Sequence, residues 1–182
     1  MATYISMLRG INVSGQKKIL MIDLKELYEK LGFKKVRTYI QSGNVIFETQ
    51  SKLSQEQIAE RIKSAIFNKY KFDVPVLVKS LNEVQNTLIT NPFIKEENVI
   101  HDRIYVTFLT ELPKNNELEK IKTLDCSPDK FIIINKEVFL YCPNKYGESK
   151  LSNNFFENKL KVSATTRNWK TVNKLVEIAL KQ

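Results

Sequence analysis

The spacing of hydrophobic and polar positions changes along the chain, and each spacing predicts one kind of secondary structure. An apolar run over residues 3–9 ends at Gly10 and enters a polar loop, which predicts a short strand. Between residues 24 and 31 the apolar side chains recur at helical spacing, and Gly32 follows as a left-handed stop. The opening segment therefore predicts a strand followed by an amphipathic helix.

The chain then continues with a strand pair, a helix and a further strand. Ser42 and Gly43 separate two β-rich runs, and Gly43 supplies the positive φ that a tight hairpin needs. The resulting order β-α-β-β-α-β over residues 1–80 is the plan of a ferredoxin-like subdomain with both helices on one sheet face. The expected elements are strands over 36–41 and 44–49, a helix from the capping box of Ser54 and Gln57 to about Tyr70, and a strand over 74–79.

A similar but less regular plan recurs over residues 81–182. We therefore predict an α+β fold of two ferredoxin-like subdomains packed together, spanning residues 1–80 and 81–182, with Phe155, Phe156 and Trp169 buried. The expected elements of the second subdomain are a connector helix from the capping box of Ser80 and Glu83 to Asn91-Pro92, a strand over 103–109, a helix over 115–124, a hairpin of 131–134 and 138–142 around Asn135-Lys136, and two final helices, the first carrying Leu151, Phe155, Phe156 and Leu160 and the second carrying Trp169, Val172, Val176 and Ala179.

Composition places the chain among ordinary folded proteins. Its 182 residues are 42% hydrophobic and 10% aromatic. The amino-terminal run has neither the pattern of a signal peptide nor that of a membrane span, so we expect a cytoplasmic location and no membrane partner. Cys126 and Cys142 lack metal-site or disulfide spacing and are interpreted as packing residues, and His101 as a surface loop residue. Neither a metal nor a cofactor is expected.

Basic residues exceed acidic ones throughout the chain. The net charge is +9, of which +6 falls within residues 1–90 and +3 within residues 91–182. Such an excess attracts nucleic acid or anionic metabolites. However, 24 of the 29 basic residues are lysines, whereas arginine is the usual reader of guanine and phosphate groups. A general contribution to solubility is the competing explanation of the lysine excess.

Four sequence stretches stand out together: LRGINV at 8–13, YIQSGNV at 39–45, YGESKL at 146–151 and ATTRNW at 164–169. As a set they resemble the bacterial family of domain of unknown function 1697, nearly from end to end. The resemblance implies a two-subdomain α+β fold whose first half is ferredoxin-like, and it implies no established activity. Ser14 and Lys145 stand where the family usually has glycine, which makes both loops less permissive.

Two cations are expected at helix starts, where the macrodipole disfavours positive charge. Arg167 is predicted in the first turn of the last helix, with Thr165 and Thr166 as capping residues. Lys150 is predicted in the first turn of the preceding helix, with Ser149 as its cap. An anion held by free helix N–H groups would compensate these cations. The structural alternative is that Arg167 pairs with a carboxylate or a carbonyl of the other half.

We predict that one group of residues converges into a basic, anion-binding cleft between the halves, because each lies at a strand end, a hairpin or a helix start. Alternatively, the loops flanking Gly10 and Gly43 lie at opposite ends of the sheet, and their residues only shape turns. The predicted group is Arg9, Asn12, Ser42, Asn44, Lys150, Thr166 and Arg167.

Three classes of function are consistent with these sequence features. The first hypothesis is a binding protein for an anionic ligand or nucleic acid, although the sequence predicts a poor aromatic platform for stacked bases, with only Tyr4 and Tyr39 as candidates. An enzyme acting on a small phosphorylated or carboxylated metabolite is the alternative. No motif pairs a serine or cysteine with a histidine, so the sequence identifies no nucleophile and leans against an enzyme. A third possibility is an interaction module for an acidic partner protein. The sequence leaves the oligomeric state open.

Overall fold

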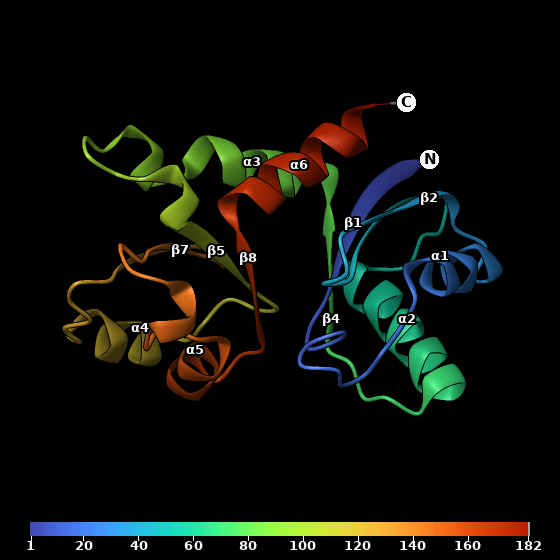
Figure 1. Ribbon diagram of the computed structural model, residues 1–182, viewed down its shortest axis with the longest axis horizontal. Helices are drawn as coiled ribbons and strands as arrows, with labels where there is room; N and C mark the ends of the chain where they lie inside the picture. Colours follow the sequence, from blue (N-terminus) through green and yellow to red (C-terminus); the bar gives the residue numbers. More distant parts are fainter. Residues whose placement is uncertain (182) are drawn as a thin grey trace. The chain divides into compact units, whose positions relative to one another are not determined.

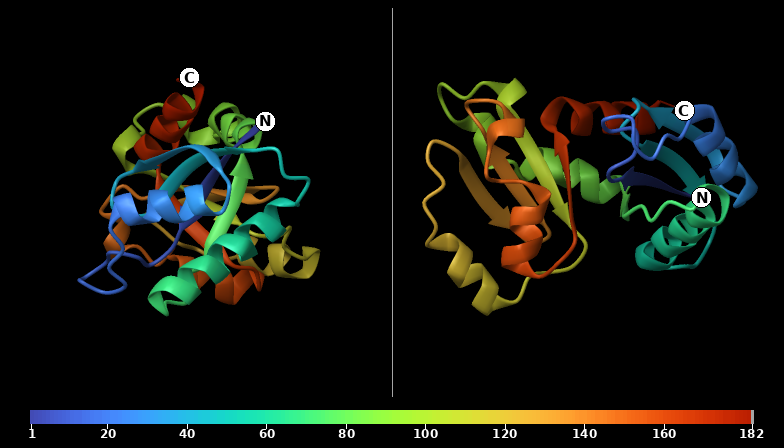
Figure 2. Two further views of the ribbon diagram at one scale, coloured as in Figure 1. Left: turned by 90° about the vertical axis from the view of Figure 1, so that its right-hand side faces the viewer. Right: turned by 60° about the horizontal axis from the view of Figure 1, so that its bottom comes forward.

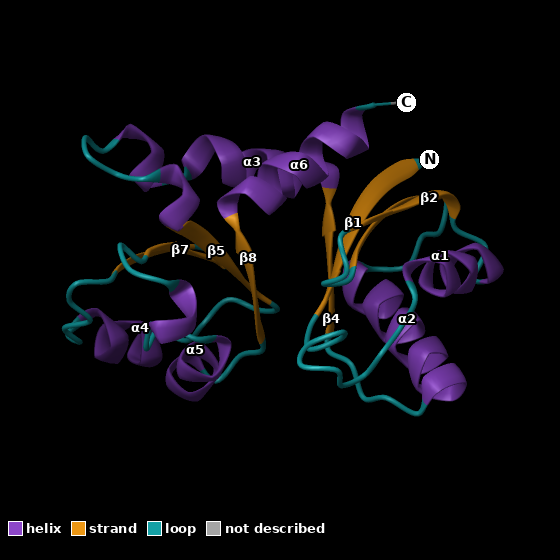
Figure 3. Cartoon of the chain, viewed as in Figure 1, coloured by secondary structure: helices purple, strands orange, loops and turns teal. Residues whose placement is uncertain are grey.

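Two antiparallel sheets of four strands each form the framework of the computed structural model, which describes residues 1–181 (Figures 1 and 3). The first sheet has the strand order β2-β3-β1-β4 and the second has the order β6-β7-β5-β8. These orders are equivalent, because in each half the first strand lies between the third and the fourth. The fold is therefore α+β with two ferredoxin-like halves, as predicted.

Contacts divide the chain into two compact units. The first unit comprises Met1–Asn86 together with the segment that starts at Leu175, and the second comprises Thr87–Lys174. The boundaries fall inside the helices α3 (Leu81–Thr90) and α6 (Trp169–Leu180). The elements of the first unit are β1 (Ala2–Leu8), α1 (Met21–Lys30), β2 (Lys34–Tyr39), β3 (Asn44–Thr49), α2 (Gln55–Tyr70) and β4 (Val76–Ser80).

The second unit repeats this order after two short 3₁₀ turns. Its sheet and helices follow the sequence prediction up to Tyr141, with strand ends shifted by one residue. Its elements are β5 (Ile104–Leu109), α4 (Asn115–Lys122), β6 (Lys130–Ile134), β7 (Glu137–Tyr141), α5 (Asn153–Leu160) and β8 (Ala164–Asn168), with 3₁₀ turns over Pro92–Lys95, His101–Arg103 and Tyr146–Glu148.

In the first unit α1 and α2 cover one face of the sheet (Figures 1 and 2). The amphipathic spacing predicted this, since Leu24, Leu27 and Tyr28 are the buried residues of α1. The Tyr28 hydroxyl is held in the core by the Ser6 hydroxyl, 2.7 Å away. The capping box of Ser54 and Gln57 at the start of α2 is present as predicted.

In the second unit α4 and α5 cover one face of the sheet, again on the side that carries alternate apolar residues. Ile121, Phe156 and Leu160 enter this core, and Phe156 is fully buried. Trp169 is buried as predicted, whereas Phe155 is only partly buried.

The hairpin turn of the first sheet and the start of the last helix differ from the prediction. The connection between β2 and β3 contains four residues, 40–43, because β2 ends at Tyr39. The segment 164–168 is a strand, β8, and does not belong to the last helix. Its hydroxyl-rich sequence is typical of a helix cap, but five residues of this segment pair with β5, so tertiary pairing decides its conformation.

The end of α6 is held by a residue from the first sheet. The Arg37 Nη1 atom donates to the carbonyl oxygen of Ile178 at 2.6 Å and also to that of Lys181. Carbonyls in the last turn of a helix have no partner within the helix, and a cation is favourable there. This contact explains why the segment from Leu175 belongs to the first unit.

Candidate anion-binding site

Four of the seven predicted site residues lie in two loops of the first unit: Arg9, Asn12, Ser42 and Asn44. The two loops contact each other. Asn12 Nδ2 donates to the carbonyl oxygen of Gln41 at 2.9 Å, and the Leu8 amide donates to that of Gly43 at 2.8 Å. The structure therefore brings these four residues to one end of the first sheet.

The side chains of Asn12 and Asn44 are engaged in holding these loops. Asn12 also donates to the carbonyl of Ile19 and accepts from the Ile19 amide, each at 2.9 Å, so its amide group closes the loop after β1. Asn44 is fully buried and donates to the Tyr39 carbonyl at 3.1 Å and to the Ser42 hydroxyl at 3.0 Å. Both side chains thus have structural roles, and any role in ligand binding stays a prediction.

Thr166 and Arg167 lie in β8 of the second unit. The prediction that Thr165 and Thr166 cap the last helix is wrong, because α6 begins at Trp169 and Asn168 Oδ1 accepts from the Lys170 amide at 2.8 Å. Thr166 Oγ1 lies 2.6 Å from Thr107 Oγ1. It also donates to Asn153 Oδ1, at the start of α5, at 2.8 Å. Thr166 therefore ties β8 to β5 and to α5.

Arg167 points to the opposite face of the second sheet from Thr166, because successive strand residues alternate. It is 8% exposed, and burial lowers the pKa of its guanidinium to about 10. Its Nη1 atom donates to the Thr166 carbonyl at 3.0 Å. The predicted conflict with a helix macrodipole does not exist at this position, since the residue precedes the helix as part of a strand. Its distinguishing property is burial.

Lys150 precedes α5 and does not belong to its first turn. The cap of α5 is Ser152, whose hydroxyl accepts from the Phe155 amide at 3.2 Å, so the predicted cap at Ser149 is wrong. Ser149 has a different role, because its hydroxyl donates to Asp129 Oδ2 at 2.6 Å and accepts from the Leu151 amide at 3.0 Å. These bonds fix the backbone on either side of Lys150.

Lys150 lines a hollow of about 130 Å³ at the end of the second sheet where β7 ends and β6 begins. Lys145 lines the same hollow, and within residues 1–181 neither lysine forms an ion pair. The carboxylates at the hollow are Asp129, which Ser149 already holds, and the exposed Glu148. The hollow thus offers two available ammonium groups on a backbone that is locally fixed.

A second hollow of about 430 Å³ adjoins the first and shares Cys126 and Asp129 with it. It runs along β6, and its walls combine apolar side chains with charged ones at the rim. Two of the rim charges, Lys122 and Lys130, are paired with Glu119 and Glu96. The residues that line it are Lys122, Leu124, Asp125, Cys126, Asp129, Lys130, Phe131, Ile132 and Ile133. Sequence analysis did not identify this hollow, since its residues come together only when β6 lies beside the loop after α4.

The thiols near these hollows are not activated nucleophiles. Burial raises the pKa of Cys126, and Asp125 and Asp129 add to this effect, which outweighs the opposing charge of Lys150. Burial also raises the pKa of Cys142 to about 11. His101, the one histidine of the chain, is exposed in a 3₁₀ turn. Hydrolytic chemistry through a cysteine therefore has no support in this arrangement.

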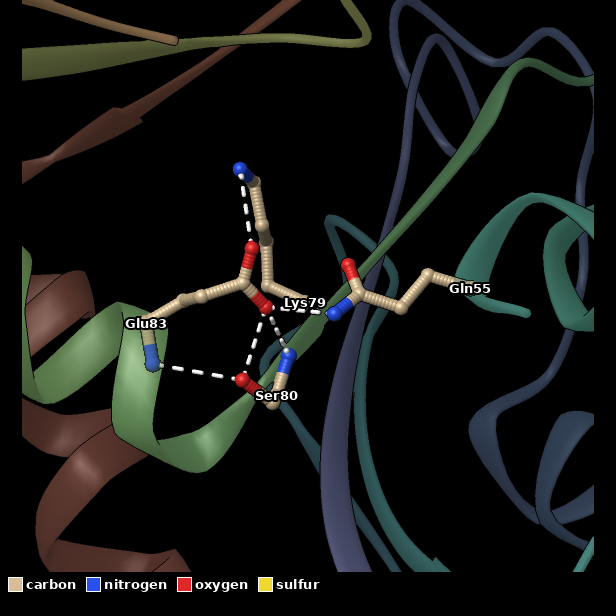
Figure 4. A network of polar contacts seen from close by, with 4 residues as sticks. All are labelled: Gln55, Lys79, Ser80 and Glu83. Atoms are coloured by element: carbon tan, nitrogen blue, oxygen red, sulfur yellow. Dashed lines mark hydrogen bonds and ion pairs between the residues drawn. The ribbon is translucent and has the colours of Figure 1, made fainter. Parts of the chain in front are cut away.

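A partly buried polar network joins β4 to α3 in the first unit (Figure 4). Glu83 accepts from the Ser80 amide at 2.8 Å and from the Ser80 hydroxyl at 2.7 Å, which is the capping box predicted from sequence. It also accepts from Gln55 Nε2 at 2.5 Å and forms an ion pair of 3.5 Å with Lys79, which is 4% exposed. Sequence analysis missed these last two contacts because Gln55 and Lys79 belong to other elements.

This network keeps Glu83 ionised. Burial raises its pKa, but the hydrogen bonds from Ser80 and Gln55 and the charge of Lys79 together outweigh burial and leave the pKa below its ordinary value. A carboxylate of this kind is a poor proton donor near neutral pH. We interpret the role of this network as structural, because it holds the start of α3 against the end of β4 and the start of α2.

Within residues 1–181, no three His, Cys, Asp or Glu side chains are grouped so as to hold a metal ion. None of the helices in this part of the chain is long and apolar enough to span a membrane.

The sequence matches one protein family over most of its length. The family described as protein of unknown function (DUF1697) matches residues 1–139. The chain belongs to this family. Two of the four stretches that suggested the DUF1697 resemblance lie within the matched residues, and the stretches at 146–151 and 164–169 lie beyond them.

A solved structure extends the similarity over the remaining residues. The conserved bacterial protein SP0830 from Streptococcus pneumoniae is 26% identical in sequence, with a TM-score of 0.74. The similarity covers 100% of this chain and 99% of that protein. No curated protein matches the chain. The comparisons thus establish the family and the two-unit architecture.

Proposed function

We propose that this protein binds an anionic ligand and that Lys145 and Lys150 recognise its negative charge. The observation that carries this proposal is the hollow at the end of the second sheet, where both ammonium groups are available and Ser149 holds the neighbouring carboxylate. A lysine ammonium offers three donors to carboxylate or phosphate oxygens, and a hollow increases its effect by limiting competition from water. Binding, without covalent chemistry, is the role that these groups support.

A small anion fits these observations better than a nucleic acid does. Recognition of single strands depends on exposed aromatic rings, whereas Tyr4 is partly buried against the core of the first unit and stacks on the buried Phe47, with ring centroids 5.9 Å apart. The local charge is also limited, since Asp129 and Glu148 lie beside the two lysines. The further prediction that Arg9, Asn12, Ser42, Asn44, Thr166 and Arg167 join Lys150 in one cleft is a separate proposal.

The test is a titration of the full chain with inorganic phosphate, acetate and a short single-stranded oligonucleotide at low ionic strength, followed by NMR shifts and calorimetry. We expect phosphate or acetate to bind, and the double variant Lys145→Glu and Lys150→Glu to lose that binding by about tenfold or more. Lys114→Glu is the matched control, because Lys114 is exposed in the same unit and does not line the hollow.

Two results would overturn the proposal. One is equal affinity for the small anions in the wild type, the double variant and the control. The other is preferential binding of the oligonucleotide with a steep dependence on salt, which would identify the protein as a nucleic-acid binder through counterion release.

A further inference from the structure

The second sheet has an open edge at β6. In the order β6-β7-β5-β8, the strand β6 pairs with β7 on one side, and none of the other strands described here pairs with its outer side. An edge strand presents main-chain N–H and C=O groups that can pair with a further strand. The sequence of β6, KFIII, has no proline and only one charge, so nothing in it blocks such pairing.

The register identifies which main-chain groups face outward. The two-residue turn Asn135-Lys136 makes Ile134 and Glu137 opposite partners, and the Lys136 carbonyl accepts from the Leu109 amide of β5. Because main-chain groups alternate sides along a strand, those of Glu137, Phe139 and Tyr141 face β6. Their opposite partners are Ile134, Ile132 and Lys130. The N–H and C=O groups of Phe131 and Ile133 therefore point to the open edge.

The larger hollow lies along this same edge. Its lining includes the four consecutive residues Lys130, Phe131, Ile132 and Ile133. Side chains of successive strand residues point to opposite faces, so a hollow that touches all four lies beside the strand and not over one face. Leu124, from the loop after α4, supplies an apolar wall. An extended chain placed there would meet both main-chain partners and apolar walls.

The smaller hollow fixes the direction of such a chain. It lies where β6 begins, next to the larger hollow, and carries Lys145 and Lys150. A segment that adds antiparallel to β6 ends at this point with its carboxyl terminus. A parallel segment would instead bring its amino terminus beside two lysines, and this like-charge approach is unfavourable. The lysines therefore favour the antiparallel direction.

We propose that β6 binds the extended carboxyl-terminal segment of a partner protein by antiparallel strand addition, with the terminal carboxylate at Lys145 and Lys150. This inference rests on the proposed function and specifies its ligand. Main-chain bonds to Phe131 and Ile133 supply affinity, and the apolar walls select the side chains of the last few residues. The net charge of +9 opposes self-association, which favours a different protein over a second copy of this chain.

The probe is an acetylated pentapeptide of alternating valine and threonine with a free carboxyl terminus, added to the ¹⁵N-labelled full chain. We expect amide hydrogen exchange at Phe131 and Ile133 to slow on binding, whereas Ile132 and Ile134 are protected with or without peptide. Amidation of the peptide terminus should weaken binding by about tenfold or more, as should the double variant Lys145→Glu and Lys150→Glu.

Methylated peptides provide a control that leaves the protein unchanged. N-methylation of the alternate residues whose amides face β6 should abolish binding, and methylation of the other set should leave it intact, because only the first set donates to the strand. Equal binding of the two methylated peptides would overturn the inference. So would a concentration-dependent dimer whose Phe131 and Ile133 amides are already protected without peptide.

The two proposals fail in different ways. If phosphate or acetate binds through Lys145 and Lys150 but the peptide does not change the exchange of Phe131 and Ile133, the strand-addition inference is wrong and the proposed function stands. If no anion binds through these lysines, the proposed function itself is wrong.

Discussion

The hydroxyl of Ser149 donates to the carboxylate of Asp129 at 2.6 Å and so joins the segment after β7 to the segment before β6. Both hollows of the second unit are bordered by Asp129. This single bond therefore helps to hold the walls of the hollow that contains Lys150, although neither Ser149 nor Asp129 supplies positive charge to a ligand. Ser149, which the sequence predicted as a helix cap, therefore acts as a link between these two segments.

Ser149→Ala should weaken anion binding without removing a charge. The variant loses the bond to Asp129 and the acceptor for the Leu151 amide, so the loop that carries Lys150 loosens. We expect a stability loss of about 1 kcal/mol in urea unfolding, together with reduced phosphate affinity. Ser152→Ala is the control, since loss of this helix cap also costs about 1 kcal/mol but should leave the affinity unchanged. Equal affinities in both variants would contradict the assigned role of Ser149.

Asn12→Ala should destabilise the first unit. The side chain makes three hydrogen bonds, with the Ile19 amide, the Ile19 carbonyl and the Gln41 carbonyl, and its loss leaves these groups without their partner. We expect a loss of roughly 1 to 3 kcal/mol in chemical denaturation. Asn154→Ala, an exposed position on α5, should cause no comparable loss. If Asn12→Ala were as stable as the wild-type protein, the proposed structural role of the Asn12 side chain would be wrong.

Gly43→Ala should be among the more damaging single changes. Gly43 has a φ of +78°, and an added Cβ would lie 2.7 Å from Ile11 Cδ1 and 2.8 Å from Leu8 Cβ. Left-handed strain and overpacking together predict a loss of roughly 2 to 4 kcal/mol. Gly15→Ala separates the two causes, because Gly15 has a φ of +76° but no atom within 4 Å of the added Cβ. Thermal unfolding of both variants measures the difference, and equal losses would show that packing at Gly43 is unimportant.

Glu83 should contribute stability that depends on pH. Its pKa in the folded state lies below the ordinary value of 4.5, despite burial, because Ser80, Gln55 and Lys79 favour the charged form. The ionised group therefore stabilises the fold above the unfolded pKa, and this stabilisation is lost as the pH falls through the folded pKa. Glu83→Gln should cost about 1 kcal/mol near pH 7 and less near pH 3 in urea unfolding. A difference that grows on acidification would contradict this assignment.

The two thiols should differ in their reactivity. Burial raises the pKa of Cys142 to about 11, whereas Cys126 is partly exposed and its pKa is raised less. Because the thiolate is the reacting form, iodoacetamide at pH 8 should modify Cys126 slowly and leave Cys142 unmodified until the protein is denatured. Mass spectrometry of tryptic peptides distinguishes the two sites. Rapid modification of Cys142 in the native protein would contradict its buried environment.

Local chemistry was sufficient to predict most of the elements. The capping boxes of Ser54 with Gln57 and of Ser80 with Glu83 are each made by residues three positions apart, and both are present in the structure. The turn at Asn135-Lys136 likewise depends on neighbouring residues only. Short-range hydrogen bonds and hydrophobic periodicity can be read from neighbouring residues without knowledge of tertiary contacts, so the sequence alone determined the strand and helix order as far as Tyr141, and with it the ferredoxin-like plan.

Tertiary structure decided the features on which the candidate site depends. Residues 164–168 form a strand because β5 offers them a partner, and a hydroxyl-rich pentapeptide by itself is equally suited to capping a helix. Arg167 is therefore a buried strand residue and not a helix-start cation. The bond from Ser149 to Asp129 joins segments separated in sequence by a hairpin, and the hollow along β6 forms only where that strand lies beside the loop after α4. Such contacts depend on register and packing across the sheet, which the spacing of residues along one segment does not encode.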